Sequence, residues 1–348
     1  MASGMAWMLE LAESGRAPDW LIRQGIRRLL ERRRRALVAT PEGWQERRAA
    51  IFETLSEGAV TESVEAANAQ HYEVPTRFYQ LCLGPRLKYS CALYEPGTRT
   101  LAEAEDAMLA RTCERAGIRD GDRILELGCG WGSLTLFMAE RFPRSEILAI
   151  SNSAGQREHI RAEAERRGFT KVSVRTTDVA ALELDEASFD RVVSVEMFEH
   201  VRNHLQLMGS IRRWLRPGGA LFVHHFSHRD SPYLFEDEGA DDWMARHFFT
   251  GGVMPSHDLL LNLNGGLRPE RQWVVGGVHY GETCLAWLQN LDRRRAEVEA
   301  ALGAGVDGAE ARLRTRRWRL FFMACEELFR ARGGAEWFVS HSRFVKDD

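Results

Sequence analysis

The sequence lacks any apolar stretch long enough to cross a bilayer, and its six cysteines show none of the paired spacings that metal sites use. The first residues, MASGMAWMLELAES, form a short apolar stretch that Glu10 and Glu13 interrupt. We therefore expect a helix there and no secretory leader. No internal repeat or low-complexity tract is evident. These absences predict a reduced, cytoplasmic protein with no metal site and no stable membrane insertion.

A net charge of one sign is also missing, because 47 basic and 50 acidic residues leave a formal charge of -3. Such a balance creates no overall field that would attract nucleic acid, so no nucleic-acid partner is expected. The 348 residues are 44% hydrophobic, which is enough to bury a large core. The expected partner is a small-molecule substrate, and a homodimer is compatible with the sequence.

Between Pro18 and Arg48 the sequence is rich in arginine and has a helical pattern. Ile22, Ile26 and Leu30 recur at helical spacing beneath the arginines. Such an amphipathic helix can rest on a lipid surface. The commoner arrangement is an apolar stripe packed on the core with a solvated arginine face, and we favour it here.

From about Asp120 strands and helices alternate, which is typical of a parallel sheet covered by helices. Strands are predicted at 123–127, 147–151, 172–176, 190–195 and 219–226. Helices are predicted near 132–141, 154–167 and 203–215, and Pro217-Gly218-Gly219 ends the last of them. The pattern predicts an α/β, Rossmann-like sheet with helices on both faces.

The alternation stops after Ser227, and the next residues are rich in aromatic, glycine and acidic residues. We expect a lid at 228–285, helices at 281–302 and 309–331, and a short final strand near 336–345. The predicted organisation has three parts: an N-terminal helical region at 1–118, a cofactor-binding core at 119–227, and a lid with C-terminal helices at 228–348.

A glycine-rich turn follows the first predicted strand. Gly128, Gly130 and Gly132 alternate, and a helix begins near Ser133. Glycine lets the backbone approach a ligand closely, and the start of the helix offers free N–H groups. With Glu126 before it, this turn resembles the first motif of class I S-adenosylmethionine methyltransferases. Glu126 would then hold the turn or the ammonium group of the cofactor.

Polar residues follow the next two strands, at the edge where an open parallel sheet binds its ligand. The second strand ends at Ser151-Asn152-Ser153, whose side chains could meet ribose hydroxyls. After the third strand, Asp178 could accept a hydrogen bond from an adenine and Val179 could pack on its ring. A helix cap is the structural alternative for Asp178.

The fourth strand runs into a cluster of acids and an imidazole: Glu196, Glu199 and His200. Two further histidines, His224 and His225, end the fifth strand. Titratable groups that converge on this edge are candidates for general base chemistry, because burial beside apolar rings raises the pKa of a carboxylate. Glu199 could instead cap the helix near Asn203, and one histidine could serve packing.

Long stretches of the chain resemble a known family. They run from His71-Tyr72 through KYSCALY, ELGCGWGSLTLFMAERFP, ISNSAGQREHI, SVEMFEHVRNH, LFVHHFSH, FEDEGADDWMARHFFTGGVMPS, HYGETCLAWL and WRLFFMACEELF. The chain resembles the coclaurine N-methyltransferases, within the superfamily of cyclopropane-fatty-acid synthases. The resemblance covers roughly 71–345 and implies S-adenosylmethionine as the cofactor.

The resemblance also implies roles for individual residues. The cofactor's methionine part would be bound by Tyr89, Ser90, Gly128 and Gly130. Its adenosine part would be bound by Asn152, Gln156, Asp178 and Val179. Glu196, Glu199 and His200 match the group that lines the amine site of the N-methyltransferases. Cys91, His225 and Tyr280 match positions where the lipid synthases hold a bicarbonate base.

Three positions qualify the resemblance. The lipid synthases usually have glycine where this chain has Glu196, and a second carboxylate favours a cationic amine and repels bicarbonate. The segment Asn262 to Trp273 departs from the plant enzymes, and we expect it to contribute to the substrate pocket. Cys325 matches a cysteine once proposed as catalytic, but its helical neighbours are apolar and we expect a buried core thiol.

The resulting hypothesis is a methyltransferase that acts on the nitrogen of a small cyclic or aromatic amine. Glu199 or His200 would take the proton. Aromatic residues would exclude water: Phe198, Trp243, Phe248 and Phe249. Methylation of a small thiol or sulfide, or of a lipid alkene as in the cyclopropane synthases, remains open on the sequence.

Overall fold

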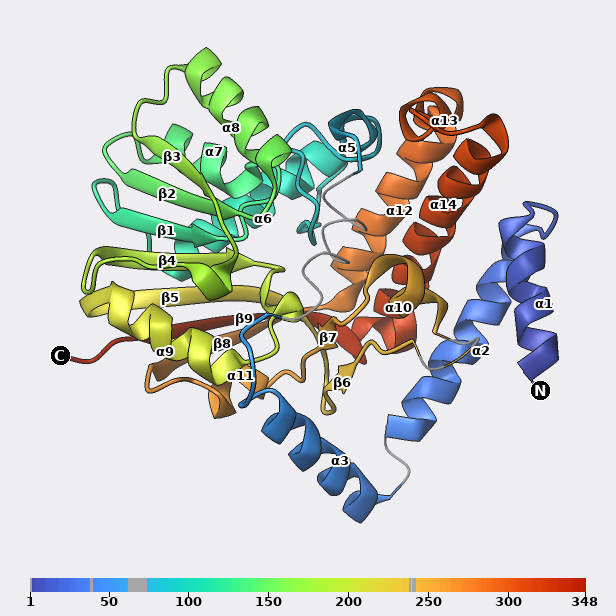
Figure 1. Cartoon of the computed structure of the whole chain (residues 1–348), viewed down its shortest axis with the longest axis horizontal. Helices are drawn as coiled ribbons and strands as arrows, with labels where there is room; N and C mark the ends of the chain where they lie inside the picture. Colours follow the sequence, from blue (N-terminus) through green and yellow to red (C-terminus); the bar gives the residue numbers. More distant parts are fainter. Residues whose placement is uncertain (1, 38–39, 62–73, 238, 240–241) are drawn as a thin grey trace.

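A mixed sheet of seven strands organises the structure, a computed structural model that describes residues 2–37, 40–61, 74–237, 239 and 242–348 (Figure 1). The strand order is β3-β2-β1-β4-β5-β9-β8. The strands are β1 (Arg123–Leu127), β2 (Glu146–Ser151), β3 (Val172–Thr176), β4 (Phe189–Val195), β5 (Leu215–His228), β8 (Arg268–Val275) and β9 (Trp337–Val345). Strands β1 to β5 are parallel, and β9 lies antiparallel between β5 and β8.

Helices cover both faces of this sheet, as predicted. One face carries α6 (Leu101–Ala116), α7 (Ser133–Arg141) and α8 (Ala154–Arg167), and the other carries α9 (His204–Trp214) and α11 (Leu259–Asn262). Alternation along β1 explains this, because Ile124 packs under α6 and α7 while Leu125 and Leu127 pack against α9. The prediction of an α/β, Rossmann-like sheet with helices on both faces is confirmed.

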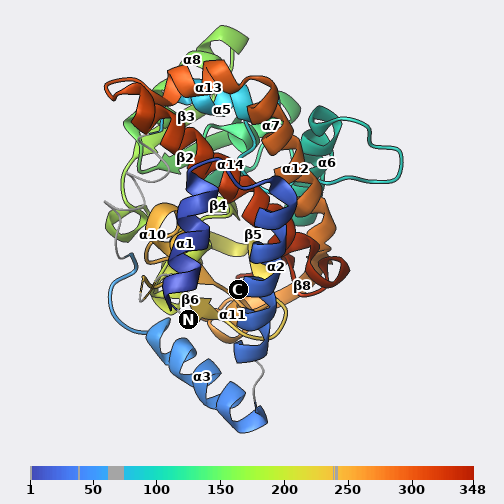
Figure 2. The same cartoon turned by 90° about the vertical axis from the view of Figure 1, so that its right-hand side faces the viewer.

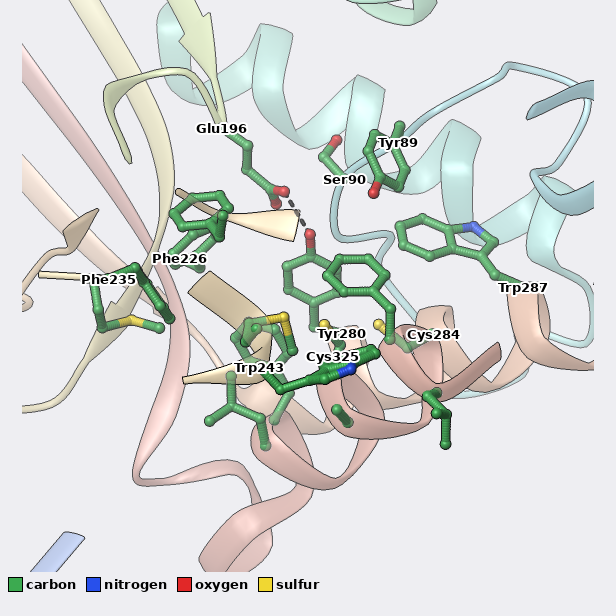
Figure 3. Close-up of a pocket in the computed structure, with 18 of the residues that line it drawn as sticks. Tyr89, Ser90, Glu196, Phe226, Phe235, Trp243, Tyr280, Cys284, Trp287 and Cys325 are labelled. Carbon is green, nitrogen blue, oxygen red and sulfur yellow. Dashed lines mark hydrogen bonds between the residues drawn. The ribbon is translucent and has the colours of Figure 1, made fainter. Parts of the chain in front are cut away.

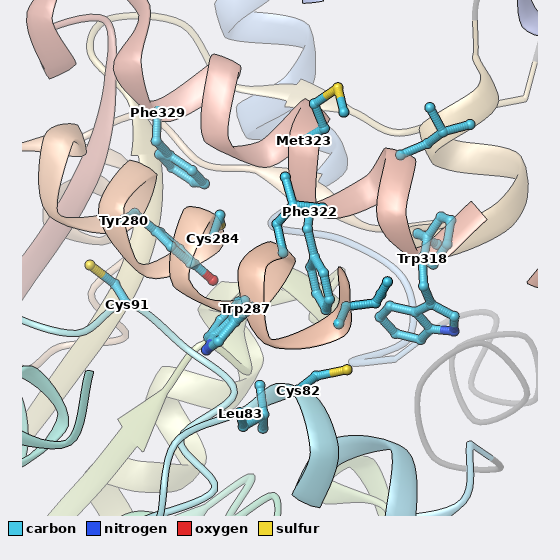
Figure 4. Close-up of a cluster of buried hydrophobic side chains, with 14 of the residues drawn as sticks. Cys82, Leu83, Cys91, Tyr280, Cys284, Trp287, Trp318, Phe322, Met323 and Phe329 are labelled. Atoms are coloured by element: carbon cyan, nitrogen blue, oxygen red, sulfur yellow. The ribbon is translucent and has the colours of Figure 1, made fainter. Parts of the chain in front are cut away.

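A second group of helices packs beside the C-terminal ends of the parallel strands. It consists of α5 (Thr76–Cys82), α12 (Gly277–Arg293), α13 (Arg295–Leu302) and α14 (Gly308–Arg330). Their core is aromatic, with Trp287, Trp318 and Phe322 buried between α5, α12 and α14 (Figure 4). Short elements connect this group to the sheet: β6 (Tyr233–Leu234), α10 (Trp243–Phe248), β7 (Val253–Met254) and a 3-10 turn at Ala331–Gly334.

The N-terminal helices are α1 (Ala2–Glu13), α2 (Asp19–Leu37) and α3 (Pro41–Thr54), and the first two lie on the side of α14 (Figure 2). The apolar stripe of α2 packs on the core as expected, through Ile22, Ile26 and Leu30. The arginine face was expected in solvent. This holds for Arg27, whose side chain is 65% exposed although it pairs with Glu327, and it is wrong for Arg23, which is partly buried against Glu326 and Glu327 of α14.

Several predicted elements differ from the observed ones. The basic segment forms two helices, α2 and α3, and the predicted helix 281–302 divides into α12 and α13. Strand β8 was not predicted, so residues of the expected lid region complete the central sheet. Within the described residues, no helix combines the length and the apolar character that crossing a bilayer requires. His71 and Tyr72, where the family resemblance begins, lie outside the described residues, as do 238, 240 and 241.

Candidate active site

The glycine turn joins β1 to α7, and all three glycines have left-handed backbone angles, with φ of +78°, +52° and +81° for Gly128, Gly130 and Gly132. A Cβ at Gly128 would lie 2.6 Å from the Cβ of Met197, and one at Gly132 would lie 2.6 Å from a carbon of Ile160. A Cβ at Gly130 would meet no atom of the described residues within 4 Å. Packing therefore explains two glycines, whereas Gly130 faces open space.

A cavity of about 700 Å³ begins at this turn and extends between the sheet, the C-terminal helices and the N-terminal helices α1 and α2. Its wall on the turn side includes Gly128, Gly130 and Trp131. Figure 3 shows the opposite part, where aromatic side chains from helices, from β5 and from loops share the cavity wall with Glu196, and the Tyr280 hydroxyl meets its carboxylate. These aromatic residues include Tyr89, Phe226, Phe235, Trp243, Tyr280 and Trp287. The cavity thus joins the predicted cofactor turn to an aromatic chamber.

Three polar groups lie within hydrogen-bond distance of the Glu196 carboxylate. Glu196 follows β4 with a left-handed φ of +49°, which is uncommon for a residue with a side chain. Its Oε1 accepts a hydrogen bond from the Cys91 N–H (3.0 Å) and lies 3.1 Å from His224 Nε2, and its Oε2 accepts one from the Tyr280 hydroxyl (2.5 Å). Burial raises the pKa of Glu196, and the Lys88 ammonium opposes this rise.

Glu199 and His200 lie on the 3-10 turn Phe198–His200, which follows Glu196. His200 lines the cavity, and its ring lies 4.8 Å from that of Phe249. Glu199 is fully buried and does not line the cavity; its Oε1 accepts a hydrogen bond from the Phe226 N–H at 2.8 Å. Its Oε2 has no hydrogen-bond partner among the described residues. Burial, with the nearby Glu196, raises the pKa of Glu199 well above its usual value.

The predicted cofactor residues divide into two groups. Tyr89, Ser90, Glu126, Gly128, Gly130 and Gln156 line the cavity, whereas Asn152, Asp178 and Val179 do not. Asp178 caps the 3-10 turn Val179–Ala181 through the Ala180 N–H (2.8 Å) and accepts a hydrogen bond from Thr61 (3.0 Å). The capping alternative for Asp178 is therefore realised in the structure.

Glu126 points toward the first turn of α7, where it accepts a hydrogen bond from the Thr135 hydroxyl at 2.5 Å. It is buried, and burial raises the pKa of its carboxyl to about 8. The contact ties the end of β1 to the helix that follows the glycines. Of the two roles considered for Glu126, this contact corresponds to the first, which is to hold the turn.

Cys91 and His225 are buried and lie outside the cavity wall. Burial raises the pKa of the Cys91 thiol well above its usual value. The His225 Nδ1 lies 3.0 Å from the Ser227 hydroxyl, and its Nε2 has no partner within the described part of the chain. Burial lowers the pKa of His225 to about 4, so this imidazole is neutral at physiological pH. Tyr280, the third residue of this predicted group, does line the cavity.

Several expectations for the substrate region are wrong. Trp243 and Phe249 line the cavity, but Phe198 and Phe248 pack in the cores on either side. No residue of 262–273 lines the cavity, because the second half of this segment forms edge strand β8 and the first half lies directly before it. Cys325, expected as a core thiol, is only partly buried and lines the cavity near Cys284 (Figure 3).

Two residues at Glu196 were not predicted as site residues, Lys88 and His224. Lys88 is buried, lines the cavity and donates a hydrogen bond to the Ser90 hydroxyl. A lysine directly before Tyr89 and Ser90 could have been suspected from its position in the KYSCALY motif. His224 was noted as one of a pair, but alternation along a strand does not tell which imidazole faces the site.

Comparisons with known proteins agree with this geometry. The family model for mycolic acid cyclopropane synthetase matches residues 60–335. An (S)-coclaurine N-methyltransferase of Thalictrum flavum subsp. glaucum is 34% identical over 97% of this chain and 95% of its own length. The cyclopropane-fatty-acyl-phospholipid synthase of Escherichia coli K12 is 28% identical over 80% of this chain and 68% of its own.

A solved structure extends the likeness to the whole fold. The crystal structure of a coclaurine N-methyltransferase, bound to N-methylheliamine and S-adenosylhomocysteine, superposes with a TM-score of 0.93 at 33% identity. The match covers 98% of this chain and 99% of the other. The predicted resemblance is therefore confirmed.

Proposed function

Since the chain belongs to the mycolic acid cyclopropane synthetase family and is an S-adenosylmethionine-dependent methyltransferase, we propose that it methylates the nitrogen of a small cyclic or aromatic amine. The observation that carries this proposal is the Glu196 carboxylate in the wall of an aromatic chamber. A buried carboxylate and surrounding aromatic faces both attract a cation. Coclaurine and pavine N-methyltransferases are among the relatives of this chain.

The turn side of the cavity fits the cofactor, because Gly130 leaves open space where a side chain would stand. Tyr89, Ser90, Gly128 and Gly130 would hold the methionine part. Gln156, which lines the cavity, would hold the adenosine part; the same role for Asn152, Asp178 and Val179 rests on the family resemblance, because they lie outside the cavity wall. When bound, the cofactor supplies a sulfonium methyl group, which is already a strong electrophile. The residues of the protein would then place the amine in line with the sulfonium methyl group and exclude water.

Proton removal from the amine would fall to His200 or Glu199. His200 lines the chamber and can meet the substrate directly. Glu199 stands one residue before it, and its buried Oε2 has no hydrogen-bond partner in the part of the chain that the structure describes, so this oxygen would be the one to accept a proton. Replacing both, as Glu199→Gln with His200→Ala, should lower turnover far more than it lowers cofactor affinity. Equal losses in turnover and in cofactor binding would refute these roles.

The decisive experiment measures S-adenosylhomocysteine release by the purified protein with separate classes of acceptor. The panel contains cyclic secondary amines, small alkyl amines, thiols including sulfide, and unsaturated phospholipids. Release with cyclic amines only supports the proposal. Release with thiols or with phospholipids alone refutes the amine assignment and favours one of the two alternatives.

The sequence suggests three further properties that belong to the same proposal: a cytoplasmic location, a homodimer, and no nucleic-acid partner. The near balance of charge supports the last of these. Light scattering after size-exclusion chromatography would measure the mass of the assembly against the 39.6 kDa of one chain.

A further inference from the structure

Behind Glu196, a line of hydrogen bonds crosses the sheet away from the cavity. Glu196 Oε1 lies 3.1 Å from His224 Nε2, and His224 Nδ1 lies 3.0 Å from His341 Nε2. His341 Nδ1 lies 2.7 Å from a guanidinium nitrogen of Arg115 on α6. Strand register places these groups together, since His224 of β5 stands directly opposite His341 of β9 and beside Val195 of β4. The line therefore runs from the substrate chamber across β5 and β9 to α6, which covers the same face of the sheet.

The last member of the line fixes the direction of every hydrogen bond in it. A guanidinium group only donates, so His341 Nδ1 must accept, and the proton of neutral His341 must sit on Nε2. His341 Nε2–H then donates to His224 Nδ1. The proton of neutral His224 is thereby placed on Nε2, from which it donates to Glu196.

Both imidazoles are suited to this neutral state. His224 and His341 are fully buried, and burial lowers the pKa of each well below its usual value. Burial also lowers the pKa of Arg115, but only to about 10, so the guanidinium remains charged at physiological pH. One fixed cation therefore orients two neutral rings toward one carboxylate.

Strand β8 contacts Arg115, the last residue of this line. The Arg115 guanidinium lies 5.0 Å from the ring centre of Trp273, and Trp273 stands opposite His341 in the register of β8 and β9. Trp273 ends the segment 262–273, which was expected to contribute to the substrate pocket. That segment lies away from the cavity and still reaches the site through Arg115 and His341.

We propose that His341 and Arg115 are positioning residues that fix the tautomer of His224 and so keep Glu196 an oriented carboxylate. The inference rests on the proposed function, in which Glu196 attracts a cationic amine. The direction of the line also shows what it does not do. His224 offers no free lone pair to Glu196, so a proton on Glu196 cannot pass outward along the line.

Other groups near Glu196 limit how much this line contributes. They are Lys88 and Cys91 from the segment before α6, Tyr280 from α12, His225 from β5 and Glu199 from the adjoining turn. All of them remain when the line is cut. Without His341, His224 can place its proton on Nδ1 and turn a lone pair toward Glu196. Loss of one donor to a charged group then corresponds to a rise of about one pH unit in the titration of Glu196.

The test compares matched variants by the pH dependence of kcat/KM, with whichever acceptor the wild-type protein turns over. His341→Leu and Arg115→Met cut the line, whereas His341→Gln and Arg115→Lys keep a donor in place. Arg111→Met removes a cation from the same helix outside the line and is the control. We expect the acidic limb to move up by about one pH unit in the cut variants only. An unmoved limb in His341→Leu, or an equal shift in His341→Gln, overturns the proposal.

A second readout needs no acceptor and separates this inference from the proposed function. Nitrogen-15 spectra of histidine-labelled protein distinguish the two neutral tautomers, and the variants His224→Gln and His341→Gln assign the signals. We expect both rings to carry the proton on Nε2 and not to titrate between pH 6 and 9. A proton on Nδ1 of either ring overturns the inference, whereas failure of amine turnover alone overturns only the amine assignment.

Discussion

Gly128→Ala would test the packing of the cofactor turn against the catalytic edge. Alanine must keep the left-handed backbone, with φ of +78°, which costs about 1–2 kcal/mol. Its Cβ would also stand 2.6 Å from the Cβ of Met197, and relieving such overpacking costs about 1–3 kcal/mol. We therefore expect the free energy of unfolding to fall by about 2–5 kcal/mol.

Gly168→Ala is the matched control for this prediction. Gly168 ends α8 with a similar φ of +74°, but a Cβ there would meet none of the described atoms within 4 Å. It should therefore lose only the backbone part, about 1–2 kcal/mol. Urea unfolding followed by tryptophan fluorescence measures both variants, and calorimetry measures their affinity for S-adenosylmethionine.

The two variants should also differ in function. Met197 directly follows Glu196, so its displacement in Gly128→Ala should disturb the chamber as well as the turn, whereas Gly168→Ala should bind the cofactor normally. If Gly128→Ala is no less stable than Gly168→Ala and binds the cofactor equally well, the contact with Met197 does not explain this glycine.

Three further predictions concern stability. Burial raises the pKa of Glu105 from 4.5 to about 7, so its contribution to stability is full below pH 4.5 and is lost as the pH rises through 7. The wild-type free energy of unfolding should therefore be higher at pH 5 than at pH 8, and Glu105→Gln should reduce this difference by up to about 3 kcal/mol. Parallel pH profiles of the two proteins would contradict this. Phe322→Ala should lower the free energy of unfolding by about 3–5 kcal/mol in urea, since its side chain is fully buried. Arg23→Ala leaves buried Glu326 and Glu327 with fewer partners and should cost about 1–3 kcal/mol; an unchanged urea midpoint would show that these ion pairs contribute nothing.

The alternation of strands and helices was readable because its causes are local. Buried strands such as Ile124 to Leu127 are short apolar runs, and the glycines that follow must adopt left-handed angles in any fold that contains this turn. The predicted strands and helices of 119–227 accordingly agree with the structure within a few residues. Tyr89, Gly130 and Gln156, which the resemblance assigns to the cofactor, line one cavity.

Strand β8 was not predicted, because its own sequence has no pattern that is typical of a strand. Residues Arg268 to Trp273 are polar and mostly exposed, and only pairing with β9 makes them a strand. The same is true of Arg23, whose partners lie 303 and 304 positions away in the chain. Pairings over such distances leave no periodic signal.

The sequence by itself determined the sheet of 119–227, the cofactor turn and the presence of Glu196, Glu199 and His200 at one edge, since strand ends and glycine angles are properties of neighbouring residues. Only the tertiary structure decided which of these groups face the substrate, placing His200 in the cavity wall and Glu199 outside it. It also joined Arg115 and His341 to Glu196. Such hydrogen bonds depend on distance and direction in space, which the order of residues along the chain does not specify.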